Sequence, residues 1–152
     1  MRIVAATLGA LALALPAFGA AGTGLKATVS PQRSGATPVE LTLKAGFELQ
    51  CGKPLGGTMV VTLPAASSIA HPLTRAAVLL NGHQLKAVKA VANVVTLTVP
   101  PATGPVCDVI ARATVTITFT RAAQYVNPAR PGSYAIKMSY RGQTVTGHLA
   151  VH

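Results

Sequence analysis

Residues 114–120 read TVTITFT, so threonine alternates with valine, isoleucine and phenylalanine over seven consecutive positions. Successive side chains of a β-strand point to opposite faces, and such alternation is therefore typical of a strand that buries one face. Threonine suits the outer face because its branched Cβ fits the pleated backbone while its hydroxyl meets water. The stretch predicts a half-buried strand of an antiparallel sheet.

The same period of two recurs on both sides of this stretch. We expect its apolar members to face the core: Val39, Leu41, Leu43, Ala45, Met59, Val61, Leu63, Val95, Leu97, Val99, Val115, Ile117, Phe119, Tyr134, Ile136, Met138, Tyr140, Val145, Leu149 and Val151. No convincing helical period accompanies these runs. The pattern predicts an all-β fold, an antiparallel β-sandwich of about seven to nine strands.

Turn signals separate the predicted strands. Asn81-Gly82 and Arg141-Gly142 predict tight hairpin turns, because Asn and Gly tolerate positive φ. Within Ala65–Leu80 we expect a short helical turn before a strand. The Val-rich segment Lys86–Val95 predicts one further strand.

The N-terminus has the layout of a secretory signal. An arginine precedes an uncharged apolar run at 3–15, and small residues follow that allow cleavage after Gly19 or Ala21. The run is shorter than the roughly 20 residues that span a bilayer. We therefore expect residues 1–21 to be a signal peptide and 22–152 to form one domain with no transmembrane segment. A secreted, periplasmic or cell-surface location follows from this prediction.

Two cysteines, Cys51 and Cys107, agree with export. An even number of cysteines in an oxidising compartment predicts a disulfide, and only one intramolecular pairing is possible. A bridge that closes a loop of this length stabilises a fold by about 4 kcal/mol.

The charge balance is strongly basic. Thirteen lysines and arginines stand against three acidic residues, for a net charge of +10, and the basic residues are spread along the chain. A surface of this kind attracts polyanions. The charge has two interpretations, of which the first is favoured: it maintains solubility, or it contacts an anionic cell-wall polymer or another surface protein through the loops Pro64–Arg75 and Pro100–Val106. Nucleic acid is not expected, since aromatic residues for stacking on bases are scarce.

The second half of the chain, Val78–Val151, resembles the immunoglobulin-like domains of secreted and surface proteins of bacteria. The resemblance is carried by a strand ending in Asn81-Gly82, by the strand Val94–Pro100 and by Asn127–Tyr134 before the final hairpin. It implies an immunoglobulin-like sandwich on an exported protein. The antibody-type variant does not fit, because no tryptophan lies between the cysteines and Pro105 stands where a tyrosine corner would be.

A weaker resemblance concerns the closing hairpin, Pro131–Val151, which is similar to that of exported copper-binding proteins of the CopC type. It implies an alternative function, periplasmic or secreted copper binding, with His148, His152 and Met138 as candidate ligands. The chain departs from that family at Arg141-Gly142-Gln143, where the family carries an Asp-Gly-His-like turn, and by the lack of an N-terminal histidine.

Catalytic signatures are missing from the sequence. There is no GxSxG elbow for a nucleophilic serine, and Glu40 and Glu48 would lie about 26 Å apart along a strand. Paired carboxylates in hydrolases lie within about 10 Å of each other. We therefore expect a non-enzymatic protein without a cofactor.

Overall fold

Alternating apolar residues form ten β-strands in the computed structural model, which describes residues 24–47, 57–100 and 114–152. The strands are β1 Lys26–Ser30, β2 Glu40–Ala45, β3 Thr58–Thr62, β4 Val78–Leu80, β5 His83–Gln84, β6 Ala87–Val91, β7 Val94–Thr98, β8 Val115–Phe119, β9 Gly132–Tyr140 and β10 Gln143–Val151. Two single-turn 3₁₀ helices, η1 Arg75–Ala77 and η2 Arg121–Ala123, complete the described elements.

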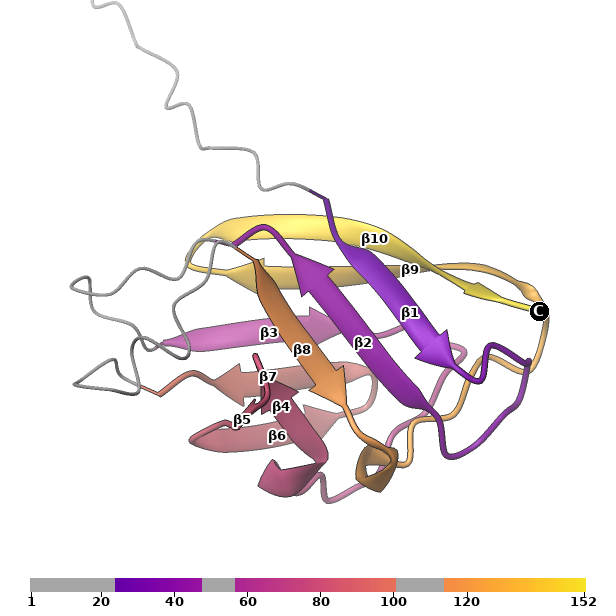
Figure 1. Cartoon of the computed structure of the whole chain (residues 1–152), viewed down its shortest axis with the longest axis horizontal. Helices are drawn as coiled ribbons and strands as arrows, with labels where there is room; N and C mark the ends of the chain where they lie inside the picture. The colour runs from indigo at the N-terminus through magenta and orange to yellow at the C-terminus, as the bar shows by residue number, and fades with distance from the viewer. Residues whose placement is uncertain (1–23, 48–56, 101–113) are drawn as a thin grey trace, which may run out of the picture.

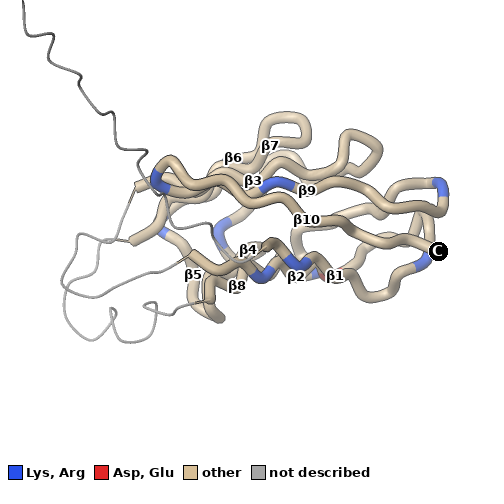
Figure 2. Tube along the Cα trace, turned by 90° about the horizontal axis from the view of Figure 1, so that it is seen from above, with Lys and Arg blue, Asp and Glu red and all other residues tan. Residues whose placement is uncertain are grey.

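The strands form two five-stranded antiparallel sheets. Sheet 1 has the order β1-β2-β8-β4-β5, and sheet 2 has the order β10-β9-β3-β7-β6. Figure 1 shows the strands of the two sheets, and Figure 2, from above, shows the sheets as two layers of a sandwich. The predicted all-β sandwich is confirmed, although the described residues contain more strands than the seven to nine expected.

The core lies between the sheets and includes every predicted inward-facing residue but one, together with buried residues that alternation did not identify, such as Leu25, Val29 and Phe47. In sheet 1, Leu43 of β2 pairs with Ile117 of β8, and both are fully buried. In sheet 2, Val61 of β3 pairs with Met138 of β9, and these two are also fully buried. One predicted core residue differs: Tyr134 is only half-buried, because it lies near the start of β9, and its hydroxyl donates to the Arg130 carbonyl at 2.7 Å.

The predicted hairpin turns are present. Asn81 and Gly82 adopt φ values of 47° and 84° between β4 and β5, and Arg141 and Gly142 adopt 49° and 76° between β9 and β10. The short helical turn expected within Ala65–Leu80 is η1, and β4 follows it directly.

The strand expected within Lys86–Val95 is present as β6, but it ends at Val91, where the chain reverses into β7 and forms the β6–β7 hairpin. Ala92 takes a φ of 50° at the turn, where Val91 pairs with Val94. Asn93 holds this turn in place, since its side-chain amide donates to the Leu63 carbonyl at 2.8 Å and its own carbonyl accepts from the Leu63 amide at 2.8 Å. The turn is therefore anchored by Leu63, which directly follows β3 and is distant in sequence.

Several predictions concern residues outside the described ranges. These are the signal peptide at 1–21, the disulfide between Cys51 and Cys107, and most of the loop Pro100–Val106. They stay predictions. In the described part of the chain, no helix has the length and apolar character needed to cross a membrane.

Candidate functional site

Lysine and arginine positions are distributed over both layers of the sandwich (Figure 2). Ten of the thirteen lie within the described residues: Lys26, Arg33, Lys44, Arg75, Lys86, Lys89, Arg121, Arg130, Lys137 and Arg141. Glu40 is the only acidic residue in the same ranges. The described surface is therefore even more one-sided in charge than the whole chain.

The outer face of sheet 1 carries the closest pair of strand lysines. Lys26 of β1 and Lys44 of β2 are direct partners in the antiparallel register, and Thr116 of β8 is the next residue in that row. Both lysines are exposed. Sequence reasoning missed this pair because it treated the basic residues as spread along the chain, and only strand pairing brings the two together.

A row of threonines runs beside the lysine pair. Thr28 of β1, Thr42 of β2 and Thr118 of β8 are successive partners across three strands. Their hydroxyls give the outer face donors and acceptors without charge. The outer face of sheet 1 is therefore an exposed, hydroxyl-rich surface on which the two lysines supply positive charge side by side.

The predicted binding loop Pro64–Arg75 is tied to η2 and to the segment that follows it. Ser68 forms an isolated bridge with Val126, and the Ala70 amide donates to the Ala123 carbonyl at 2.9 Å. Beside this loop is a shallow hollow of about 300 Å³, and a second of about 350 Å³ adjoins it. The first is lined by Thr37, Pro38, Ser68, Ile69, Ala70, Gln124 and Val126.

The second hollow is lined by the connection between β1 and β2, with Arg33 as its one basic residue. Arg75, at the end of the predicted loop, directs its guanidinium to the Lys86 carbonyl at 3.3 Å instead of to either hollow. The two hollows therefore offer mostly neutral polar groups to a ligand.

The candidate copper ligands do not converge. Met138 is fully buried on the inward face of β9, whereas His148 is exposed on the outward face of β10, opposite Ala135. His152 follows β10, and its backbone amide donates to the Gln32 carbonyl at 3.0 Å. Within residues 24–47, 57–100 and 114–152, no three His, Cys, Asp or Glu side chains group as metal ligands would.

Burial perturbs one titratable side chain near the first hollow. Loss of solvation raises the pKa of Tyr125, and the Ser67 hydroxyl, which lies outside full hydrogen-bonding geometry, lowers that pKa by less. Tyr125 is completely buried and forms an isolated bridge with Val39. Its phenol faces the core and is part of the packing, not of a reactive surface.

Comparison with known proteins shows what the fold is similar to. No protein-family model and no curated protein sequence matches the chain. Among solved structures, the chain is similar to BslA, described as a bacterial hydrophobin, with 16% identity and a TM-score of 0.55 over 85% of this chain and 97% of that one.

For two further structures, the match covers a smaller share of the other protein. The N-terminal domain of the Streptococcus gordonii adhesin Sgo0707 gives 12% identity and a TM-score of 0.48, over 88% of this chain and 33% of that one. BcpA, the major pilin subunit of Bacillus cereus, gives 10% identity and a TM-score of 0.47, over 84% of this chain and 38% of that one. The similarity to BslA shows a shared fold. The predicted resemblance to β-sandwich domains of bacterial surface proteins is thus confirmed at the level of the fold.

Proposed function

We propose that the protein is an exported structural or binding module of the cell surface, which attaches to anionic wall polymer through its basic side chains. The observation that carries the proposal is the charge of the described surface, where ten basic residues stand against one acidic residue. A surface with this excess repels copies of itself and attracts polyanions. The β-sandwich fold shared with BslA, a bacterial hydrophobin, supports this location.

Binding, rather than catalysis, is the activity that we propose. The positive charges lie on exposed strands and turns, and the hollows near Thr37 and Pro38 are shallow and mostly neutral. Affinity for a polyanion needs only charges at the surface, and it weakens as salt shortens the distance over which they act.

Retention on a purified anionic wall preparation tests the proposal. The protein should bind at about 0.05 M salt and elute well before about 1 M salt, where the screening length falls to about 3 Å. A neutral polysaccharide matrix is the control. Equal retention on both matrices, or retention that salt does not change, would contradict the proposal.

Export is tested separately. Cell fractionation should find the processed protein outside the cytosol with no titratable thiol in the native state, as the predicted disulfide requires. Recovery of the unprocessed chain from the cytosol would overturn the surface location.

A further inference from the structure

Lys26 and Lys44 stand directly opposite each other on adjacent strands. The Cβ atoms of such partners lie about 5 Å apart, and like charges at this spacing destabilise a sheet. A fold gains nothing by itself from this arrangement. The pair therefore concentrates two positive charges at one place on the sheet at a small cost in stability.

No acidic group among the described residues relieves the repulsion. Glu40, the one acid that the structure describes, pairs with Ser30 at the opposite end of the β1–β2 ladder. Four residues along an extended strand separate it from Lys44 by about 13 Å. At physiological salt the screening length is about 8 Å, so the carboxylate has little effect on the ammonium groups.

Hydroxyl groups surround the pair instead. Thr116 lies next to Lys44 in the same row, and Thr28 and Thr42 form the next row along the two strands. The Thr28 hydroxyl approaches the Thr42 carbonyl at 3.5 Å, at the limit of a hydrogen bond. Two ammonium groups side by side match an anionic group with at least two acceptor oxygens, one for each ammonium, and the hydroxyls nearby can donate to further oxygens.

The surface around the pair favours a polymer over a small ion. Lys26 and Lys44 line neither of the two hollows near Thr37 and Pro38, and both side chains are exposed. A single small anion on an open face is held weakly, whereas a chain of anions gains from binding at several positions along the sheet.

The surface also favours a polymer over a lipid bilayer. Among the described residues, the exposed large apolar side chains are Val91 and Val94, which lie on β6 and β7 of sheet 2. Sheet 1 therefore has no exposed large apolar side chain of its own to insert into a bilayer.

We propose that Lys26 and Lys44 form the primary docking site for a linear phosphodiester polymer on the outer face of sheet 1. The two non-bridging oxygens of one phosphodiester accept hydrogen bonds from the two ammonium groups, and the threonine rows contact the neighbouring units. This inference rests on the proposed function. It locates the binding of polyanions on the outer face of sheet 1 and identifies the anionic group as a phosphodiester.

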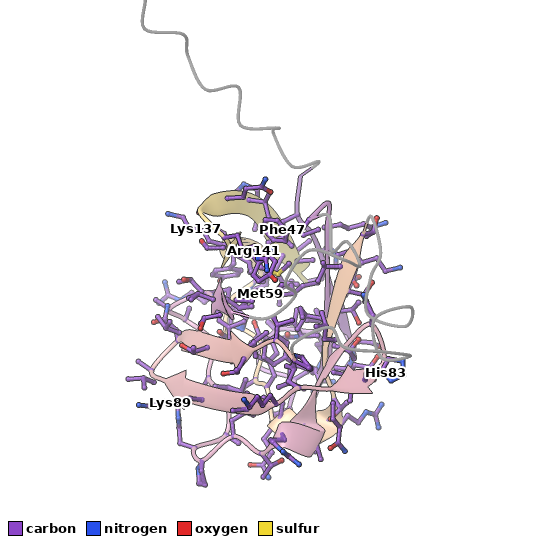
Figure 3. All side chains as sticks on the ribbon, turned by 90° about the vertical axis from the view of Figure 1, so that its left-hand side faces the viewer. Phe47, Met59, His83, Lys89, Lys137 and Arg141 are labelled. Atoms are coloured by element: carbon purple, nitrogen blue, oxygen red, sulfur yellow. The ribbon has the colours of Figure 1, made fainter. Side chains whose placement is uncertain are left out.

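The test uses two charge-matched double variants of the full chain. K26Q/K44Q removes the pair, and K89Q/K137Q removes two exposed lysines from sheet 2, where β3 and β7 lie between their strands. Figure 3 shows Lys89 and Lys137 well apart. Each double variant lowers the net charge by the same amount. A difference in their binding therefore reflects where the lysines lie and not the total charge.

Binding to long-chain inorganic polyphosphate, measured by titration at constant salt, is the readout. Its units are joined by anhydride bonds, but each internal phosphate carries one negative charge and two non-bridging oxygens, as a phosphodiester does. K26Q/K44Q should weaken the apparent affinity about 30-fold, as expected if each lysine near an anionic surface contributes about 1 kcal/mol. K89Q/K137Q should weaken it no more than about threefold, and K26R/K44R should retain binding. Thermal unfolding should show K26Q/K44Q at least as stable as the wild type, since a like-charge pair is removed.

The outcomes separate the inference from the proposed function. Equal weakening in the two double variants overturns the lysine-pair site but leaves a surface that binds polyanions. Tighter binding to polyglutamate than to polyphosphate overturns the assignment of phosphate. If the protein binds phosphatidylglycerol vesicles through the two lysines but does not bind polyphosphate, the site is a membrane site, and the assignment of a polymer as its ligand is overturned. If the wild type binds no polyanion, both the inference and the proposed function fail.

Discussion

The two lateral sides of the sandwich are built differently. On one side the edge strands β1 and β10 approach so closely that a Cβ on Gly147 would collide with the Leu25 carbonyl. Backbone hydrogen bonds continue this contact beyond the strands, from the Ser34 amide to the His152 carbonyl at 2.7 Å and from the His152 amide to the Gln32 carbonyl at 3.0 Å. We call this side, with the adjoining residues 125–128, the closed side.

On the other side the sheets end in β5 and β6, which we call the open side. β5 contains only two residues, and the edge strand β6 leaves Val91 60% exposed next to its turn. The exposed Lys89 in the middle of β6 places a charge where another strand would otherwise pair. Tight packing therefore joins the sheets on one side, whereas short strand length and charge protect the edges on the other.

The substitution with the largest expected effect disrupts the closed side. Gly147→Ala places a methyl group against the Leu25 carbonyl, so β1 and β10 must separate. Overpacking against backbone should lower the free energy of unfolding by about 3 kcal/mol, measured by urea denaturation.

Gly24→Ala is the matched control for this substitution. A Cβ on Gly24, two residues before β1, meets no atom within 4 Å. Its effect should stay within about 0.5 kcal/mol. Similar losses of stability in the two variants would show that the contact between Leu25 and Gly147 does not hold the closed side together.

An intermediate effect compares one asparagine from each side. The Asn127 side chain, 2% exposed on the closed side, donates to the Pro31 carbonyl at 3.0 Å and to the Arg33 carbonyl at 2.9 Å. The Asn93 side chain makes one such bond, to the Leu63 carbonyl, at the β6–β7 turn. Asn127→Ala should cost about 2 kcal/mol and Asn93→Ala about 1 kcal/mol of unfolding free energy, since each leaves carbonyls without donors. If Asn93→Ala lowers the unfolding free energy as much as Asn127→Ala or more, the closed side is not the more strongly stabilised of the two.

The last effect is confined to alkaline pH and concerns Tyr125, whose bridge to Val39 belongs to the closed side. Burial raises the pKa of Tyr125 above its ordinary value of 10.0. As pH rises through 10, the unfolded chain therefore loses the phenolic proton while the folded chain keeps it, and the stability of the wild type falls by up to about 1.4 kcal/mol per pH unit.

Tyr125→Phe removes the proton that causes this loss. Its unfolding free energy, measured from pH 9 to pH 11, should decline less steeply than that of the wild type. Parallel curves would show that the Tyr125 phenol ionises as readily in the folded protein as in the unfolded chain.

Much of the fold could be predicted from the sequence, but the candidate site could not. Alternation identified the buried members of β2, β3, β7, β8, β9 and β10, because strand geometry alone places neighbouring side chains on opposite faces. The β6–β7 turn was missed because Ala92 is not a turn residue by preference, and its position depends on the contact between Asn93 and Leu63. The lysine pair was missed because alternation predicts which face of a strand a residue occupies, but not which residue of a neighbouring strand lies opposite it.

The sequence by itself determined which side of each strand faces water, since this property depends only on the local backbone. The tertiary structure decided which strands lie side by side and in what register, and it thereby placed Lys26 opposite Lys44 and the Leu25 carbonyl over Gly147. Pairings between distant segments depend on the packing of the whole core, because a strand can bury the same apolar face against many partners.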